Sequence, residues 1–379
     1  MNPASIDDYR IMARRRLPRM LADYIDGGSF SDTTLSANML DLERVSLRQR
    51  VMVDVTARDM IVRVLGQTLS MPIGLAPVGI AGLYARRGEA QAARAAKGAG
   101  IPMCLSTLSI CAIEETAAAG QPPWFQLYML KDRGFMRELL ARARAAGCPV
   151  LVFTVDMPVS GGRYRDYRST GIIGAGAFDR FVQGAMRGRW VWDVLCMGGP
   201  LIPGNIAPAL PDDATIRDSL VWVGANMDTT VTWRDLDFVR EHWEGPLAIK
   251  GVLDVHDAGE AVRVGADAII VSNHGGRQLD GVRSAVAALP HIVAAVGDDA
   301  EILVDGGIRS GLDVLRMLAL GAKACLIGRP WAWALAAGGE AMVERMLGTL
   351  RAELAMAMTL TGCPRLGDAG AELVDTSVS

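Results

Sequence analysis

The sequence predicts a (β/α)8 barrel, the α/β fold in which eight parallel strands alternate with helices. Three observations support this prediction: short apolar runs occur eight times, most are followed by an amphipathic helical stretch, and most recur at similar intervals. A doubly wound sheet is the alternative, but it rarely contains eight such even units.

Two helices are expected before the barrel. Ser5 followed by Asp8 resembles a capping box and predicts the start of the first helix. Pro18 predicts the start of a second helix, and Gly27 and Gly28 predict its end. The fold therefore carries an N-terminal helical extension.

The eight apolar runs are the predicted barrel strands, at residues 73–76, 101–105, 124–127, 150–155, 246–249, 268–271, 301–304 and 324–327. The clearest amphipathic helices follow at residues 89–98, 133–146, 255–264 and 311–320. We expect one domain over residues 1–379, with the barrel at about 70–345.

A long interval between Pro158 and Pro246 breaks this rhythm after the fourth strand. Its middle mixes aromatic and apolar residues with arginines, and residues 198–211 are rich in glycine and proline. Loops of this length are uncommon unless they are functional or disordered. We interpret residues 171–229 either as an active-site lid or as a patch that contacts a membrane surface.

Composition excludes several classes of protein. The formal net charge of −3 gives no support for nucleic-acid binding. The six cysteines contain no CxxC pair, so we expect reduced thiols, no disulfide framework and no metal site. No secretion signal and no run of 18 apolar residues is present, which predicts a cytoplasmic protein with at most peripheral contact to the cytoplasmic face of the inner membrane.

The most informative motif is Ser-Asn-His-Gly-Gly-Arg-Gln-Leu-Asp at residues 272–280, directly after the sixth predicted strand. Histidine is a common general base, and a planar guanidinium binds carboxylates in a bidentate manner. His274 and Arg277 therefore suit a small substrate that has a carboxylate beside the proton it loses. A lone histidine is often a core residue, but the other three, at 242, 256 and 291, follow no predicted strand. Gly275 and Gly276 would let the backbone approach a flat ligand.

The ends of the seventh and eighth strands predict a phosphate site. Gly307 with Arg309, and Gly328 with Arg329, supply backbone N–H groups and guanidinium groups where barrels commonly bind phosphate. Two ordinary turns with surface arginines are the alternative. Lys250, at the end of a buried strand, suits either a Schiff base or the stabilisation of an anionic cofactor ring. Phosphate, a flat ring and a lysine together favour flavin mononucleotide, FMN.

Three further residues have two interpretations each. Asp156 could orient His274 through one ring nitrogen, or it could be satisfied by backbone groups or by Arg163. Tyr24 and Tyr128 could contact substrate, although tyrosines more often pack in a core with the hydroxyl satisfied.

These residues together resemble the FMN-dependent 2-hydroxyacid dehydrogenase and oxidase family. The family signature SNHGGRQLD is complete here, and the likeness extends from Tyr9 to about Gly362. Residues 70–79, 84–89, 153–158 and 163–166 are most similar to the branch of bacterial respiratory L-lactate dehydrogenases.

The resemblance implies a role for each matching position. His274 would be the base, with Asp156 as its partner, and Tyr128 would bond the substrate hydroxyl or the developing carbonyl. Arg163 and Arg277 would hold the substrate carboxylate, assisted by Tyr24. The implied FMN-binding residues are Lys250 at the flavin ring, Pro77, Val78, Gly79, Ser106, Gln126, Thr154 and Ser272 along the ring and ribityl chain, Asp305 at the ribityl hydroxyls, and Gly307, Arg309, Gly328 and Arg329 at the phosphate.

The expected function is therefore the oxidation of L-lactate to pyruvate, with FMN as cofactor and a quinone as electron acceptor. The alternatives are the same chemistry on mandelate or glycolate, an oxidase that uses oxygen, and a non-catalytic FMN-binding barrel. The joint presence of His274, Asp156 and Arg277 argues against the last of these. Family resemblance also implies a homotetramer.

Overall fold

The computed structural model describes residues 2–168, 183–184 and 186–375. Its N-terminal extension consists of α1 (Ile6–Arg16), α2 (Arg19–Asp26) and α3 (Thr33–Glu43). The predicted capping box is present, because Asp8 Oδ2 accepts hydrogen bonds from the backbone nitrogens of Ala4 (2.9 Å) and Ser5 (3.0 Å). Helix α2 ends at Gly27, as predicted. Helix α3 was not predicted from the sequence.

The central sheet confirms the predicted fold. Its eight parallel strands are β3 (Ile73–Leu75), β4 (Cys104–Ser106), β5 (Trp124–Tyr128), β6 (Leu151–Thr154), β7 (Leu247–Val252), β8 (Ala268–Val271), β9 (Glu301–Asp305) and β10 (Ala324–Ile327). Their spatial order is β3-β10-β9-β8-β7-β6-β5-β4. A parallel bridge between Leu75 and Met103 joins β3 to the start of β4 and closes the barrel.

Two strands differ from the predicted ranges by more than one residue at an end. Strand β4 starts three residues later than the run at 101–105, and β7 extends past Lys250 to Val252. The pairing of β7 with β8 is irregular between Lys250 and Val252. Gly251 at this irregularity has φ +107°, and a Cβ there would lie 2.6 Å from Cβ of Asp156. Only glycine fits this position.

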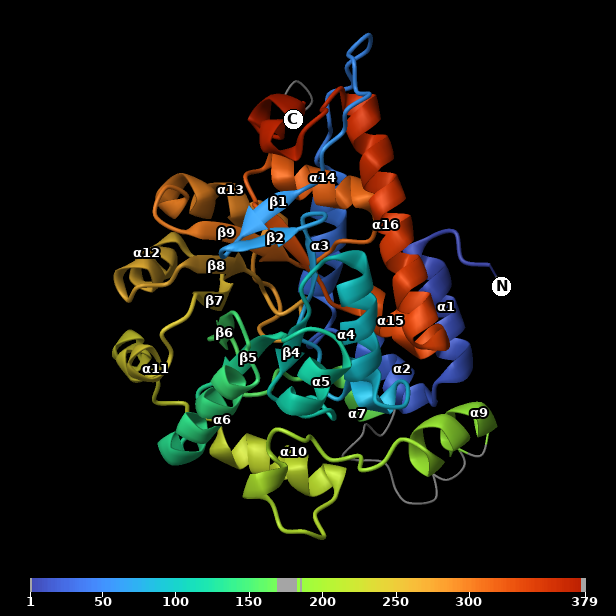
Figure 1. Cartoon of the computed structure of the whole chain (residues 1–379), viewed down its shortest axis with the longest axis vertical. Helices are drawn as coiled ribbons and strands as arrows, with labels where there is room; N and C mark the ends of the chain where they lie inside the picture. Colours follow the sequence, from blue (N-terminus) through green and yellow to red (C-terminus); the bar gives the residue numbers. More distant parts are fainter. Residues whose placement is uncertain (1, 169–182, 185, 376–379) are drawn as a thin grey trace.

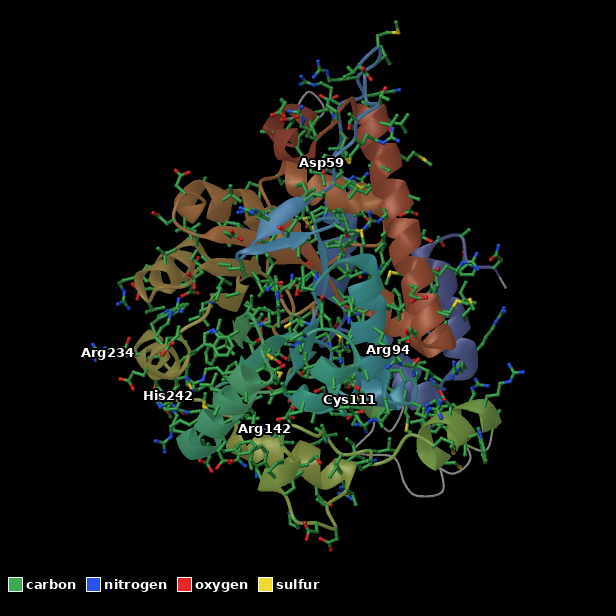
Figure 2. The ribbon with its side chains drawn as sticks, viewed as in Figure 1. Asp59, Arg94, Cys111, Arg142, Arg234 and His242 are labelled. Carbon is green, nitrogen blue, oxygen red and sulfur yellow. The ribbon has the colours of Figure 1, made fainter. Side chains whose placement is uncertain are left out.

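Helices cover the outside of the barrel (Figure 1). They are α4 (Gly88–Ala99), α5 (Ile113–Ala119), α6 (Arg133–Ala145), α12 (Val255–Arg263), α13 (Ala285–Val296), α14 (Gly311–Ala319), α15 (Arg329–Gly338) and α16 (Glu340–Thr361), with short 3-10 turns η1 (Ala81–Leu83), η5 (Leu366–Asp368) and η6 (Ala371–Leu373). Side chains fill the space between helices and strands (Figure 2). On the outer surface, Arg142 of α6, labelled in Figure 2, forms an ion pair with Glu114 of α5 at 2.7 Å.

A hairpin of β1 (Val62–Val64) and β2 (Gln67–Leu69) closes the amino-terminal end of the barrel. Val64, Leu65 and Leu69 are buried in one cluster with Trp124 and other barrel residues. The indole of Trp124 donates a hydrogen bond to Gln67 Oε1 at 3.2 Å. Because this end is plugged by side chains, the cavity of the barrel lies at the opposite, carboxyl end.

The insertion after β6 forms several short elements: α7 (Tyr164–Arg168), α9 (Gly188–Trp190), the π-helical turn η2 (Val191–Cys196), η3 (Ala207–Ala209), α10 (Ile216–Asn226), η4 (Trp233–Asp235) and α11 (Leu236–His242). Residues 171–182 and 185 of the predicted lid or membrane loop lie outside the described residues. The indole of Trp190 donates to Leu83 O at 2.8 Å, and Asp193 pairs with Arg16 at 2.7 Å. These contacts attach α9 to η1 and η2 to α1.

Candidate active site

A cavity of about 810 Å³ opens at the carboxyl ends of the barrel strands. Of the residues expected from the sequence, those in its lining are Tyr24, Pro77, Val78, Gly79, Ser106, Tyr128, Thr154, Arg163, Lys250, His274, Arg277, Asp305, Gly307, Arg309, Gly328 and Arg329. Gln126, Asp156 and Ser272 are absent from the lining and contact residues that belong to it. The topology thus collects residues from distant parts of the chain in one place.

His274 and Asp156 form a hydrogen-bonded pair in this cavity. Nδ1 of His274 lies 2.9 Å from Oδ1 of Asp156. Burial acts to raise the pKa of Asp156, but the charge and hydrogen bond of His274 outweigh it and hold that pKa below its ordinary value. Arg163 does not satisfy Asp156, since its ion-pair partner is Asp166 at 3.9 Å. The second ring nitrogen, Nε2, is left for a substrate.

The His274 backbone is held in an unusual conformation. Its φ is +57°, a left-handed value that is uncommon for residues other than glycine. The backbone nitrogen of His274 donates to Ser272 Oγ at 3.0 Å, which fixes the start of the turn. Asn273 exchanges two hydrogen bonds of 2.8 Å with Asn38 of α3, so the N-terminal extension supports the loop from behind.

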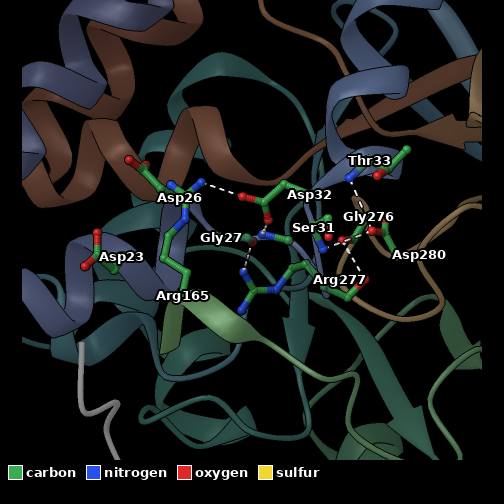
Figure 3. A network of polar contacts seen from close by, with 12 residues as sticks. Asp23, Asp26, Gly27, Ser31, Asp32, Thr33, Arg165, Gly276, Arg277 and Asp280 are labelled. Carbon is green, nitrogen blue, oxygen red and sulfur yellow. Dashed lines mark hydrogen bonds and ion pairs between the residues drawn. The ribbon is translucent and has the colours of Figure 1, made fainter. Parts of the chain in front are cut away.

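Figure 3 shows how the segment after α2 clamps the rest of this loop. Arg277 donates to the backbone oxygens of Tyr24 (2.6 Å) and Gly27 (2.8 Å). The carboxylate of Asp280 accepts from Thr34 N at 2.7 Å and so caps α3, whose own N-cap residue, Asp32, makes no side-chain hydrogen bond to the helix. On the other side, Arg165 of α7 binds Asp32 at 2.5 Å.

The two glycines of the motif are required mainly by contacts within the protein. Gly275 and Gly276 have φ of +65° and +72°. A Cβ on Gly276 would lie 2.5 Å from the backbone nitrogen of Leu35, and a Cβ on Gly275 would lie 2.8 Å from Arg329. Gly276 therefore allows α3 to pack closely, whereas Gly275 lines the cavity, and the approach of a flat ligand to it stays a prediction.

The carboxylate site predicted from the sequence contains two cations and a tyrosine. The guanidinium carbons of Arg277 and Arg163 lie 4.6 Å and 5.5 Å from the ring centroid of Tyr24. Burial alone would raise the pKa of Tyr24, but the two guanidinium charges lower it. Burial and the neighbouring charge of Arg163 lower the pKa of Arg277. A bound carboxylate would be attracted by both cations at once.

Lys250 belongs to a buried polar group at the centre of the cavity floor. Its Nζ lies 3.0 Å from Asp305 Oδ2 and donates to Ser272 Oγ at 2.8 Å. Burial acts to lower the pKa of Lys250, but the carboxylates of Asp305 and Asp156 raise it above its ordinary value. A Schiff-base lysine needs a lowered pKa. The structure therefore favours a fixed positive charge at this position.

Two half-buried arginines lie at the predicted phosphate site. The Arg309 guanidinium stacks on Trp333 at 5.0 Å, and burial lowers its pKa to about 10. Arg329 donates to the backbone oxygens of Ile25 (3.0 Å), Gly27 (2.8 Å) and Gly275 (2.8 Å). Burial and the charges of Arg277 and Arg309 hold its pKa well below the ordinary value. A dianionic phosphate would relieve this repulsion.

The cavity fits a ligand with both donor and acceptor groups. Gln126 Nε2, Thr154 Oγ1 and Asp305 Oδ1 are buried and have no hydrogen-bond partner among the described residues. Unpartnered buried polar atoms are costly, so these three atoms indicate a bound polar molecule. Gly307 has φ +84°, and a Cβ there would lie 2.1 Å from Asn38 O, so its backbone is exposed to the cavity without a side chain. These features fit a flavin nucleotide.

Sequence analysis missed several residues of the site. Tyr84 lines the cavity, and its buried hydroxyl has no hydrogen-bond partner within the described part of the chain. The apolar residues Met157, Leu220, Val223 and Met227 also line the cavity. The helical spacing of the last three was a usable signal. Among described residues no cluster of three potential metal ligands occurs, and no helix is both long and apolar enough to cross a membrane.

Fold and cavity together define a (β/α)8-barrel protein whose cationic cavity suits a phosphorylated cofactor and an acidic substrate. A family model for FMN-dependent dehydrogenases matches residues 13–376. The chain belongs to the FMN-dependent dehydrogenase family, and its cofactor is FMN.

Two relatives are similar over nearly the whole chain. An L-lactate dehydrogenase of Caulobacter vibrioides is 55% identical over 361 residues, which cover 95% of this chain and 94% of that protein. An L-lactate dehydrogenase of Acinetobacter baumannii is 53% identical over 371 residues, which cover 97% of each.

Solved structures with the same fold include enzymes that are named for mandelate. The monotopic membrane protein (S)-mandelate dehydrogenase has a TM-score of 0.93 at 33% identity and covers 99% of this chain and 100% of its own. A mandelate oxidase with (S)-2-phenylpropionate has a TM-score of 0.82 at 39% identity and covers 99% of this chain and 98% of its own.

Proposed function

We propose that this protein oxidises L-lactate to pyruvate and passes the electrons to a quinone. The observation that carries the proposal is the pairing of His274 with Asp156 at 2.9 Å in the same cavity as Arg163, Arg277 and Tyr24. A base beside a carboxylate site is what the oxidation of a 2-hydroxy acid requires. The two L-lactate dehydrogenases at 55% and 53% identity support lactate as the substrate.

The residues that would hold FMN follow from the buried polar groups. Lys250 would place a positive charge beside the ring, and Gln126 and Thr154 would offer the unpartnered atoms described above. Asp305 Oδ1 would accept from the ribityl hydroxyls, and Arg309 with Gly307 would bind the phosphate. Ser106 and the backbone of residues 77–79 line the same wall. When bound, FMN supplies the two-electron acceptor for the oxidation.

The remaining residues act on the substrate. Arg163 and Arg277 hold the carboxylate, with Tyr24 beside them, and Tyr128 bonds the hydroxyl oxygen. Burial and the nearby Asp156 raise the pKa of Tyr128, so its hydroxyl stays a hydrogen-bond donor. Nε2 of His274 takes a proton, either from the α-carbon or from the hydroxyl, and Asp156 stabilises the resulting imidazolium.

Substrate profiling tests the choice of lactate. We expect kcat/KM for L-lactate to exceed the values for (S)-mandelate and glycolate. Mandelate is the second candidate, because structures of mandelate enzymes match the fold closely. A higher kcat/KM for (S)-mandelate would move the protein to that substrate while keeping the same base and carboxylate site.

Replacing Asp156 by asparagine should reduce activity strongly and also change stability with pH. An amide fixes the wrong tautomer of His274, so we expect kcat to fall by a factor on the order of 10² to 10⁴. Because the pKa of Asp156 is lowered in the folded state, its contribution to stability is present above the unfolded pKa and is lost as pH falls through the folded pKa. Denaturant unfolding of the unaltered protein and of Asp156→Asn should be measured from pH 7 to pH 3. The difference between their free energies of unfolding should shrink below about pH 4. If the difference in the free energy of unfolding does not change with pH, the pairing of Asp156 with His274 is contradicted.

Arg309 and Arg329 should respond differently to replacement by lysine. Arg309→Lys loses a phosphate contact, so we expect weaker FMN binding and little change in KM once FMN is saturating. Arg329→Lys loses the fork that joins Ile25, Gly27 and Gly275, so the KM for L-lactate should rise as well. Titration of apoprotein with FMN and steady-state kinetics of the reconstituted variants measure both effects. Equal KM values for the two variants would show that Arg329 has no role beyond cofactor binding.

We also propose peripheral contact with the cytoplasmic face of a membrane and a homotetrameric assembly. Trp192, Leu195 and Met197, at the outer side of η2, are 66%, 48% and 50% exposed, and exposed apolar groups of this kind suit a membrane surface. Flotation with lipid vesicles and light scattering of the purified protein measure the two properties.

A further inference from the structure

A buried carboxylate outside the lining of the active-site cavity lies at the last residue of α2. The side chain of this residue, Asp26, is 1% exposed. Its Oδ2 accepts hydrogen bonds from two residues of α1, namely Arg10 Nε at 3.0 Å and Arg14 Nη1 at 2.7 Å. Its Oδ1 accepts a hydrogen bond from the indole nitrogen of Trp333, on α15, at 2.8 Å. One carboxylate therefore joins the three helices α1, α2 and α15.

The two residues on either side of Asp26 bind the same helix, α15. The backbone oxygens of Ile25 and Gly27 accept hydrogen bonds from Arg329 at 3.0 Å and 2.8 Å. Arg329 and Trp333 both belong to α15, and their spacing of four residues places them about one turn apart on one side of that helix. Three successive residues at the end of α2 are thus bonded to one turn of α15, which fixes the backbone between them.

The backbone that is fixed in this way also holds a residue of the proposed carboxylate site. Gly27 O accepts a second hydrogen bond, from Nη1 of Arg277 at 2.8 Å, and Tyr24 O accepts one from the same nitrogen at 2.6 Å. Figure 3 shows Gly27 bonded to Arg277, with Asp26 at the end of the same helix. The position of the Arg277 guanidinium, and of the Tyr24 ring beside it, therefore depends on the backbone of residues 24–27.

Asp26 is also a negative charge among several arginines. The guanidinium carbons of Arg10 and Arg309 lie 5.7 Å and 5.0 Å from the ring centroid of Trp333. Burial lowers the pKa of both Arg309 and Arg329, and the charge of Asp26 opposes that shift in each of them. Without this carboxylate the guanidinium groups around the end of α2 would repel one another more strongly, which would disfavour the bonded arrangement of the backbone.

We propose that Asp26 is a positioning residue for the binding of the substrate carboxylate. Its side chain fixes the Gly27 carbonyl, and this carbonyl holds the Arg277 guanidinium in the orientation that the substrate requires. The inference rests on the proposed function, which assigns the carboxylate site to Arg277, and it adds the residue that keeps this site in place. Because Asp26 lies outside the cavity lining, it should affect the binding of substrate and not the chemical step.

Replacement of Asp26 by asparagine tests this role. Asparagine has the same shape, but its amide nitrogen cannot accept the hydrogen bonds of Arg10 and Arg14. With FMN saturating, we expect the KM for L-lactate to rise at least about tenfold, because a small displacement of an orienting group is costly. The carboxylate end of the substrate does not react, so kcat should change by less than about twofold. Steady-state kinetics measures both constants.

Oxalate gives a readout that needs no turnover. It is a dicarboxylate that would bind the same arginines without being oxidised, and its binding can be followed by titration of the flavin absorbance. We expect its Kd to rise in Asp26→Asn by about the same factor as the KM for L-lactate, because both anions depend on the orientation of Arg277. If Asp26→Asn leaves the KM and this Kd unchanged, the proposal is overturned.

Replacement of Asp23 by asparagine is the matched control. Asp23 lies on the same helix, is also buried, and pairs with Arg14 at 3.8 Å and Arg19 at 3.2 Å. Among the contacts of the described residues, its side chain makes no bond to α15. The control therefore loses the same charge and comparable ion pairs, and its KM for L-lactate and its Kd for oxalate should stay unchanged. An equal rise in both variants would overturn the proposal, because it would show only a general effect of lost charge in α2.

A second pair of variants decides the question if Asp26→Asn does not fold. Trp333→Phe removes only the indole N–H that Asp26 accepts and keeps an aromatic ring beside Arg309. Trp331→Phe is its control, because the indole of Trp331 is also buried in α15 but donates to Ala76 O at 3.1 Å. Oxalate should bind more weakly to Trp333→Phe than to Trp331→Phe, and equal affinities would overturn the proposal.

Failure of the proposed function would give a different result. If L-lactate does not bleach the unaltered protein, while oxalate binds more weakly to Asp26→Asn than to Asp23→Asn, lactate is not the substrate and the role of Asp26 stands. If L-lactate bleaches all variants with the same KM and oxalate binds them equally, the proposed function stands and Asp26 has no positioning role.

Discussion

Replacement of His274 by asparagine is expected to remove nearly all bleaching of the flavin absorbance by L-lactate while FMN stays bound. The rate should fall by a factor on the order of 10² to 10⁴, the usual contribution of a general base. Asparagine is the appropriate substitute, because His274 has φ +57° and asparagine tolerates left-handed backbone better than alanine does. Anaerobic stopped-flow spectroscopy measures the rate, and the visible spectrum measures the bound FMN.

The matched control is His291→Asn. His291 lies on α13 and is exposed, so its replacement should leave both the rate and the FMN content unchanged. If His274→Asn is bleached as fast as the unaltered protein, His274 is not the base. Loss of FMN from His274→Asn would instead indicate a structural role of the turn.

Replacement of Lys250 by methionine should have the largest effect on stability. Lys250 and Asp305 form a buried pair with side chains 4% and 10% exposed, and removal of one partner leaves the other charge buried. Such a change typically costs about 3 to 5 kcal/mol in the free energy of unfolding. We also expect FMN affinity to fall, since the positive charge that we propose to lie beside the cofactor is lost. Urea unfolding, with and without FMN, measures both effects.

The double variant Lys250→Met, Asp305→Asn separates the two contributions. It removes both charges, so most of the lost stability should return, whereas FMN affinity should stay low. A single variant that is as stable as the unaltered protein would mean that Asp305 is protonated or solvated when Lys250 is absent. That outcome would contradict the claim that the buried ion pair of Lys250 and Asp305 stabilises the fold.

Much of the barrel could be predicted because its signals are local. Parallel strands that are buried on both faces appear as continuous apolar runs, and all eight runs correspond to strands. The Ser5–Asp8 capping box and the glycines after α2 also act within a few residues. The end of β7 was missed because Lys250 and Gly251 interrupt the apolar run, although the strand continues through them.

Elements that depend on distant partners could not be predicted in this way. Helix α3 is capped by Asp280, a contact across 246 residues of sequence, and Asp32 before it is in a left-handed conformation. The β1–β2 hairpin turns at Leu65 and Gly66, which have φ of +48° and +77°. Only Gly66 is a turn signal in the sequence, because leucine rarely adopts a left-handed conformation. The short strands of the hairpin also gave only a weak pattern.

In the candidate active site, too, some features could be predicted from local sequence and others depend on distant partners. The topology of a barrel brings strand ends together, so the identity of the cavity residues followed from their place after each strand. Apart from Asp156 with His274, their partners did not follow, because pairings such as Lys250 with Asp305, or Arg329 with the backbone of α2, join segments far apart in sequence. Some residues of the motif could serve either ligand binding or packing within the protein. Gly276 is an example, because it packs against Leu35 of α3.

Anaerobic titration of the purified protein with L-lactate tests the central claim most directly. The visible spectrum of the protein should show bound flavin, and L-lactate should bleach it fully with one pyruvate formed for each FMN, because His274 and the arginine pair act on the substrate as a unit. A flavin spectrum that L-lactate leaves unchanged, while another 2-hydroxy acid bleaches it, would contradict lactate as the substrate. A spectrum that no 2-hydroxy acid changes would contradict the proposed reaction itself.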